Sequence, residues 1–285
     1  MMAAQEIRFI KSGKVKDIYQ YGGDKLMFVF SDRVSAFDVV LPTIIPRKGE
    51  VLCRFSEFWF QVLPYPNHML EVMPPNKMIV KKLGMIPLEC VVRGYNYGSY
   101  YERLSKGVIK ADKPLRLAEE LPQPVFDPTT KSETKDLPIS KSEAVKQGLS
   151  TAEEYDLLEE TSIKLYGEMR RWADRAGFII ADVKFEFGRD EEGRILLADS
   201  LGPDEFRLWL KSEYRVGEEQ KSYDKQIVRD WLIKVSFRSK LEEARKAGLP
   251  PPTPPELPKE LVEETVRRYI TAYELISGRR LYLHA

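Results

Sequence analysis

The chain has 285 residues, of which 43% are hydrophobic and 31% charged, so it is too apolar for a disordered protein and long enough for a large core. Its 45 Lys and Arg residues nearly balance 44 Asp and Glu residues, and a net charge of +1 gives no general attraction for nucleic acid or an anionic membrane. Two cysteines exclude a disulfide scaffold, and two histidines leave little room for histidine-based catalysis or metal binding.

Residues 7–92 predict a β-rich N-terminal region. Short apolar runs suited to strands lie at residues 18–21, 26–31, 78–82 and 88–92. The Gly22-Gly23-Asp24 sequence predicts a hairpin turn between the first two runs. Large apolar residues recur at helical spacing over 52–63, so we expect one helix to pack against an antiparallel sheet.

The second half of the chain predicts a long segment, then helices and a hairpin. Residues 112–143 are polar and proline-punctuated, which indicates a functional loop or lid. Either Ser150–Glu153 or Thr151–Glu154 can form a capping box at the start of an amphipathic helix that Gly177 ends. Two strands are expected at about 179–187 and 194–199, joined by a charged turn. Six prolines within 250–258 predict an extended connector to a last, docked helix that ends at Gly278.

The first candidate for chemistry is the loop at 11–17. It combines a glycine turn at Gly13 with Lys11, Lys14 and Lys16 before a strand, which suits a loop that covers nucleotide phosphates. It matches neither the Walker loop nor the three-glycine dinucleotide motif. A basic surface hairpin is the alternative.

The predicted hairpin at 179–199 is more informative. Strand alternation places Asp182, Lys184 and Glu186 on one face, and a turn centred near 190–191 would put Asp199 opposite Asp182. Carboxylate oxygens suit Mg²⁺, which takes one or two carboxylates together with phosphates and waters. An ordinary amphipathic surface strand is the alternative.

Further cations could hold an anionic substrate. A strand at 87–95 leads into a glycine-rich turn between Arg93 and Ser99. Arg207 follows a Gly-Pro-Asp turn, and Arg229 lies on a predicted helix that includes Asp224 and Lys225. Surface salt bridges are the alternative for each arginine.

Together these segments closely resemble the SAICAR synthetase family along the whole chain. The resemblance rests on residues 13–19, 31–38, 87–99, 182–188 and 222–226 and on the last helix, and Asp-x-Lys-x-Glu-Phe-Gly at 182–188 is its most specific motif. Two positions depart from the family pattern. Tyr97 stands where a small residue is usual, and Ser200 stands where a glutamate is common, which removes a carboxylate near the expected metal site.

The resemblance implies a ligase that joins the imidazole carboxylate CAIR to L-aspartate, with ATP and Mg²⁺, and releases ADP and phosphate. It implies a two-lobed α+β fold, with an antiparallel β-rich, kinase-like N-terminal lobe (1–82), a larger α/β C-terminal lobe (83–285) and the active site in the cleft. We expect a cytoplasmic protein, possibly a homo-oligomer, with small-molecule substrates and neither nucleic acid nor a membrane as partner.

The resemblance also implies roles for individual residues. Lys184 and Asp182 are the expected catalytic residues, and Glu186 and Asp199 the expected metal ligands. The expected nucleotide-binding residues are Gly13, Lys14, Lys16, Lys81, Lys82, Glu89 and Lys131. The expected substrate-binding residues are Ser35, Asp38, Arg93, Ser99, Asp136, Asp204, Arg207, Asp224, Lys225 and Arg229.

Two other functions remain open on the sequence alone. A kinase-like small-molecule phosphotransferase would use the same lysine loop and carboxylate hairpin, and it would leave phosphate on its product instead of releasing it. A catalytically inactive nucleotide-binding regulator is disfavoured because the expected reactive residues are all present.

Overall fold

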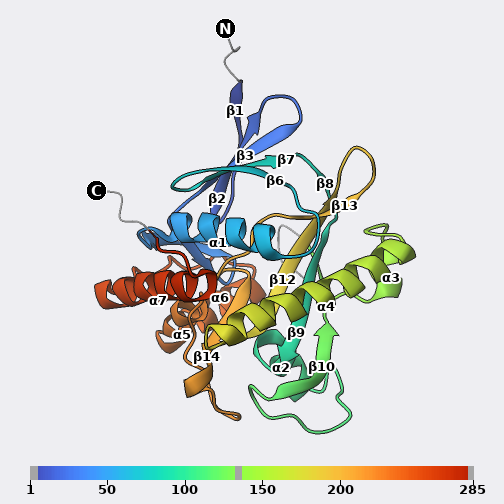
Figure 1. The fold of residues 1–285 in the computed structure, drawn as a ribbon. Coiled ribbons are helices and arrows are strands. Elements are labelled where there is room, and N and C mark those ends of the chain that lie inside the picture. The colour runs from blue at the N-terminus through green and yellow to red at the C-terminus, as the bar shows by residue number, and fades with distance from the viewer. Residues whose placement is uncertain (1–5, 132–136, 282–285) are drawn as a thin grey trace.

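The computed structural model describes residues 6–131 and 137–281, and Figure 1 shows them as two antiparallel sheets with helices packed around them. The first sheet lies at the top of Figure 1 and has the strand order β1-β2-β3-β7-β6. Its strands are β1 (Ile7–Ser12), β2 (Lys16–Tyr21), β3 (Lys25–Phe30), β6 (Met69–Met73) and β7 (Lys77–Lys81). The predicted hairpin turn at 22–24 joins β2 to β3 and is confirmed.

Helix α1 (Lys48–Val62) confirms the helix predicted beside this sheet. Its apolar side chains, among them Phe55, Phe58 and Trp59, enter a core that extends from the first sheet to the second. Figure 1 shows α1 beside α7 (Lys259–Ser277), the predicted last helix, which Gly278 ends in a left-handed conformation.

The second sheet has the central order β10-β9-β12-β13, with β11 also on β9 and with β8 and β14 also on β12. Its strands are β8 (Gly84–Met85), β9 (Leu88–Tyr95), β10 (Glu120–Phe126), β11 (Thr129–Thr130), β12 (Phe178–Arg189), β13 (Ile195–Ala198) and β14 (Phe206–Leu210). Helix α4 (Ala152–Arg175) crosses the long strands β9 and β12 (Figure 1), and its Thr151–Glu154 capping box is one of the two predicted.

The described part of the segment 112–143 corrects in part the expectation of a loop or lid. Strands β10 and β11 within it pair with β9, and helix α3 (Lys141–Lys146) begins at its end with a Ser140–Glu143 capping box. Proline and polar side chains are tolerated because β10 lies at a sheet edge.

A smaller unit completes the fold. The two-stranded sheet of β4 (Arg33–Ala36) and β5 (Val39–Ile44) packs with α5 (Gln226–Lys234) and α6 (Phe237–Lys246) around its own apolar cluster. Helix α2 (Gly98–Ser105) follows β9, and a short 3₁₀ turn (Lys211–Glu213) follows β14. The helices and antiparallel sheets together confirm the predicted α+β fold class.

The register of the β12–β13 hairpin corrects one prediction. Glu186 pairs with Ala198 and Arg189 with Ile195, so the turn is centred nearer 192 than 190–191. Asp199 therefore lies beyond the end of β13, with φ of 61°, and is not opposite Asp182. Asp182 instead pairs with Arg93 on one side and Arg207 on the other.

Candidate active site

Strand β12 supplies the centre of the candidate site. Its alternation is confirmed, because Val183, Phe185 and Phe187 are buried in the core whereas Asp182, Lys184 and Glu186 make polar contacts. Two groups of charges meet these three residues. We call them the lysine cluster (Lys16, Glu89, Lys131, Lys184, Glu186 and Asp199) and the arginine pocket (Arg93, Ser99, Asp182, Arg207 and Arg229).

Each charge in the lysine cluster has an opposite partner. Lys184 Nζ lies 2.8 Å from Glu89 Oε1 and 3.0 Å from Glu186 Oε1. Lys131 also binds Glu186, and Lys16 Nζ lies 2.5 Å from Asp199 Oδ1. Three ammonium groups thus neutralise three carboxylates drawn from β2, β9, β12 and the segments after β11 and β13.

These pairs keep the cluster ionised despite its burial. Burial would raise the pKa of Asp199, but Lys16, Lys131 and Lys184 lower it well below its usual range. Burial would likewise lower the pKa of Lys184, and Glu186 with Glu89 raises it well above its usual value. Both groups are therefore charged at neutral pH.

The surroundings of Lys16 show contacts that sequence reasoning missed. Lys16 Nζ lies 3.0 Å from the Ser200 hydroxyl and 4.8 Å from the ring centre of Phe28. The ring of His68, which is buried, lies 3.2 Å from the backbone carbonyl of Asp199. His68 thus fixes the chain beside a cluster carboxylate, a role that an isolated histidine in a loop does not reveal.

The arginine pocket is organised around Asp182. Its carboxylate accepts from Arg93 Nη1 at 3.1 Å and from Arg207. Arg93 also donates to Ser99 and to Asp127, each at 3.0 Å. Asp127, which the sequence did not single out, additionally binds Arg103.

Two arginines of this pocket, Arg207 and Arg229, lack part of the hydrogen bonding or ion pairing that would balance their charge. The Nε of Arg207 is buried and has no hydrogen-bond partner. Arg229 has no carboxylate within ion-pair distance in the part of the chain that the structure describes. Burial, and then the neighbouring Arg207, lowers its pKa. The pocket therefore has positive charge that an anion would stabilise.

The side chains of Asp204 and Asp224 are almost fully buried. Asp204 is surrounded by Lys48 Nζ at 2.9 Å, Lys225 Nζ at 3.4 Å and the Tyr269 hydroxyl at 3.0 Å. Asp224 is buried and accepts from the backbone N–H groups of Leu208 and Gln226. Asp224 and Lys225 precede α5 and are not within it, which corrects their predicted placement.

Two adjoining cavities, of about 260 and 460 Å³, open onto the arginine pocket and onto Glu89 and Lys184 of the lysine cluster. The other cluster residues, Lys16, Lys131, Glu186 and Asp199, line neither cavity. Both are lined by Glu89, Ser99, Lys184, Asp204, Arg207 and Arg229. The smaller also includes Arg93 and Asp182, and the larger includes Lys14, Ser35, Asp38 and Lys225. The structure thus brings most predicted site residues to one hollow.

The other predicted residues are placed as follows. Lys14 is half-exposed and pairs with Asp38 at 2.6 Å. Gly13 forms a tight turn, and a side chain there would approach the Lys16 carbonyl oxygen to 3.1 Å. Lys81 and Lys82 lie at the end of β7 and line neither cavity. Asp136 falls outside the described residues.

Comparison with known proteins identifies the family. The sequence profile of the SAICAR synthetase family matches residues 9–245. The chain belongs to this family. Phosphoribosylaminoimidazole-succinocarboxamide synthase of Nitrosopumilus maritimus is 49% identical, over 96% of this chain and 100% of that protein. The corresponding synthase of Corynebacterium glutamicum is 39% identical, over 96% and 95%.

Solved structures agree with this membership of the SAICAR synthetase family. The SAICAR synthase of Saccharomyces cerevisiae in complex with SAICAR has a TM-score of 0.81 at 33% identity, over 99% of each chain. A SAICAR synthetase in complex with ADP has a TM-score of 0.74 at 28% identity, over 98% of this chain and 100% of that one. The chain is accordingly a ligase of purine biosynthesis.

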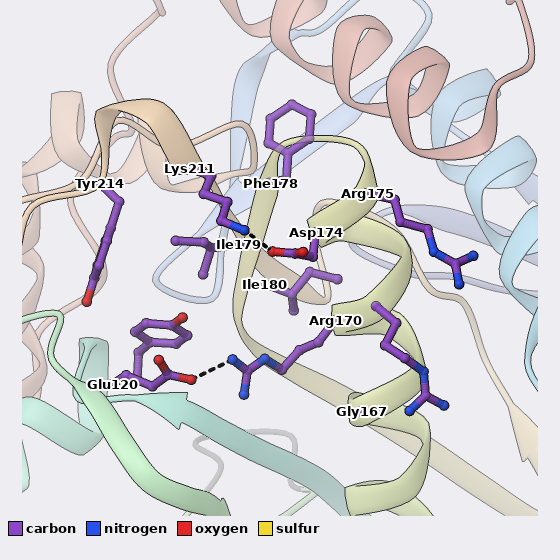
Figure 2. A pocket seen from close by; sticks show the side chains of 12 residues that line it. Glu120, Gly167, Arg170, Asp174, Arg175, Phe178, Ile179, Ile180, Lys211 and Tyr214 are labelled. Carbon is purple, nitrogen blue, oxygen red and sulfur yellow. Dashed lines mark hydrogen bonds and ion pairs between the residues drawn. The ribbon is translucent and has the colours of Figure 1, made fainter.

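A larger cavity, of about 800 Å³, is lined by none of the predicted residues. Figure 2 shows that it lies beside the end of α4, where Arg170 binds Glu120 and Lys211 binds Asp174. Arg170 and Lys211 are thus already paired with carboxylates, unlike Arg229 of the arginine pocket. The two smaller cavities and the lysine cluster beside them are therefore the candidate site of this SAICAR synthetase family member.

No helix in the described residues is both long and apolar enough to cross a bilayer.

Proposed function

We propose that the chain joins CAIR to the amino group of L-aspartate at the cleft formed by the arginine pocket and the lysine cluster, and that the coupled reaction converts ATP to ADP and phosphate. The observation that carries this proposal is that one strand, β12, supplies Asp182 to a pocket with uncompensated cations and Lys184 and Glu186 to a cluster of paired charges. Such a site can hold a phosphorylated substrate at one end and a nucleotide at the other.

The arginine pocket fits the 5′-phosphate of CAIR. Arg207, Arg229 and Ser99 line both cavities and can donate to a phosphate, while Asp182 and Asp127 hold Arg93 and Arg207 in place. The neighbouring substrate-binding residues are proposed to be Ser35, Asp38, Asp136, Asp204, Asp224 and Lys225.

The lysine cluster fits ATP. Lys14, Lys16 and Lys131 would bind its phosphates, with Gly13 allowing a close backbone approach, and Lys81, Lys82 and Glu89 would lie toward the base. Glu186 and Asp199 suit Mg²⁺, since two carboxylates complemented by phosphates and waters satisfy that ion. A bound Mg²⁺ would supply charge neutralisation at the phosphates.

Lys184 has the position for catalysis. The CAIR carboxylate attacks the γ-phosphorus of ATP to form an acyl phosphate, and ADP leaves. The aspartate amine then attacks the acyl carbon, phosphate departs, and the amine proton is lost. The Lys184 ammonium, which faces both cavities, neutralises the reacting carboxylate and the developing oxyanion.

The lobe boundary is also a proposal. The first sheet ends at Lys81 and the second begins at Gly84, which supports division of the chain into lobes 1–82 and 83–285 around the cleft. A cytoplasmic location and homo-oligomeric assembly stay predictions.

The test is a product assay. Purified protein receives ATP, Mg²⁺ and CAIR, with or without L-aspartate, and ADP, phosphate and SAICAR are measured. We expect the three products in equal amounts, only with aspartate. ADP together with a stable phosphorylated product would favour a kinase, and absence of turnover would contradict the proposal.

A further inference from the structure

We propose that Tyr97 is a positioning residue that holds the Arg207 guanidinium in the orientation that binds the substrate phosphate. The inference rests on the proposed function, because it takes Arg207 as a ligand of that phosphate. Tyr97 itself lines neither of the two cavities, so it would act through Arg207.

The guanidinium of Arg207 lies over the ring of Tyr97. Its central carbon is 5.6 Å from the ring centre, within the range of a cation–π interaction. Such an interaction is stronger where water is excluded, and the Tyr97 side chain is only 3% exposed.

The ring of Tyr97 is itself held in place. Its hydroxyl donates to the carboxylate of Glu219, and its edge packs against Trp209 with ring centres 5.0 Å apart. Trp209 in turn stacks on Tyr214, with ring centres 6.0 Å apart and planes 10° apart. A fixed ring provides a fixed support for the guanidinium face.

Two other contacts restrict Arg207 to this place. Asp182 binds its Nη1, and Gly98 leaves space for Nη2, since a side-chain carbon at Gly98 would come within 2.5 Å of that nitrogen. The buried Nε remains without a partner. Tyr97 therefore supports one face of the Arg207 guanidinium, and Arg207 itself lines both cavities. A small residue at position 97 would lack this support.

The experiment compares Tyr97→Leu with Tyr97→Phe. Leucine removes the ring, so we expect the KM for CAIR to rise about tenfold, with kcat and the KM for ATP within about twofold of wild type. Phenylalanine keeps the ring and loses only the hydroxyl, and its KM for CAIR should rise less than about threefold. Equal KM values for Leu and wild type would overturn the proposal.

A double-mutant cycle asks whether Tyr97 acts through Arg207. In an Arg207→Ala background the further change Tyr97→Leu should alter the KM for CAIR by less than about twofold. A tenfold effect in both backgrounds would show that Tyr97 acts independently and would contradict the positioning role. Tyr214→Leu is the matched control, because it removes a ring of the same aromatic cluster that does not lie on Arg207, and it should raise the KM for CAIR less than Tyr97→Leu does.

Calorimetric titration with CAIR alone separates this inference from the proposed function. Failure of the wild type to bind CAIR would contradict the proposed function. Normal binding by the wild type and by Tyr97→Leu would contradict the positioning role alone. Should the leucine variant fail to fold, Tyr97→Met, whose flexible side chain fills irregular space, takes its place with the same expectation.

Discussion

The lysine cluster and the arginine pocket are neighbours on β12, but they balance their charges in opposite ways. In the lysine cluster three ammonium groups meet three carboxylates, and each has an ion-pair partner. In the arginine pocket Asp182 and Asp127 are shared among Arg93, Arg103 and Arg207, and Arg229 has no ion-pair partner among the described residues.

The difference teaches how ligands would change each region. A ligand of the lysine cluster must replace ion pairs that already exist, so binding there exchanges partners. A phosphate in the arginine pocket would fill a place that no protein group fills. Removal of a lysine from the lysine cluster should therefore lower the free energy of unfolding. Removal of Arg229 from the arginine pocket should instead reduce repulsion between cations, and this contrast can be tested.

The largest effect is expected for Lys184→Met. The substitution removes the cation at the reacting carboxylate and leaves Glu89 and Glu186 without that partner. We expect turnover to fall by about 10³-fold and the free energy of unfolding to fall by about 2 kcal/mol. Steady-state kinetics and denaturant unfolding measure both, and turnover within tenfold of wild type would refute the role.

Arg229→Met should behave differently. We expect the KM for CAIR to rise about 30-fold or more, because a phosphate-binding cation is lost. The free energy of unfolding should stay equal or rise by up to about 1 kcal/mol, because repulsion from Arg207 disappears. Arg229→Lys keeps the charge and is the control. Marked destabilisation by the methionine would show that Arg229 is not a surplus charge.

Simple ions should distinguish the two regions without mutation. At constant ionic strength, inorganic phosphate at tens of millimolar should raise the melting temperature by a few degrees, because it binds only the folded pocket. Mg²⁺ alone should change it little, because lysines already neutralise the carboxylates. The phosphate shift should shrink in Arg229→Met, and an undiminished shift would place the anion elsewhere.

The smallest effect is expected on the reactivity of the two cysteine thiols. Burial raises the pKa of Cys53 to about 12 and that of Cys90 further, so neither thiol should react with Ellman's reagent at pH 8 in the native protein. Both should react in denaturant. Slow labelling of Cys90, which lies on β9 between the two regions, should accelerate in Lys184→Met but not in Arg229→Met.

Local patterns predicted much of this structure. The period of two in residues 182–187 fixed which side chains enter the core, and the capping box before α4 marked where that helix begins. Both features depend on neighbours in sequence, for which single-sequence reasoning is suited.

Features set by distant contacts were harder to predict. The pairing of β10 with β9 turned part of an expected loop into an edge strand, and a pairing register shifted by three residues moved Asp199 away from Asp182. His68, Asp127 and Tyr97 acquire their contacts only when separate elements pack together. No pattern around them in the sequence indicates this.

Strand β12 also sets the distance between the two ends of the cleft. Asp182 belongs to the arginine pocket and Glu186 to the lysine cluster, and four residues of extended chain separate them by about 13 Å. Covalent geometry, and not a hinge, thus sets the span between the two ends of the cleft. One residue inserted between them would turn one carboxylate into the core, so evolution can lengthen the loops around this site far more readily than the strand within it.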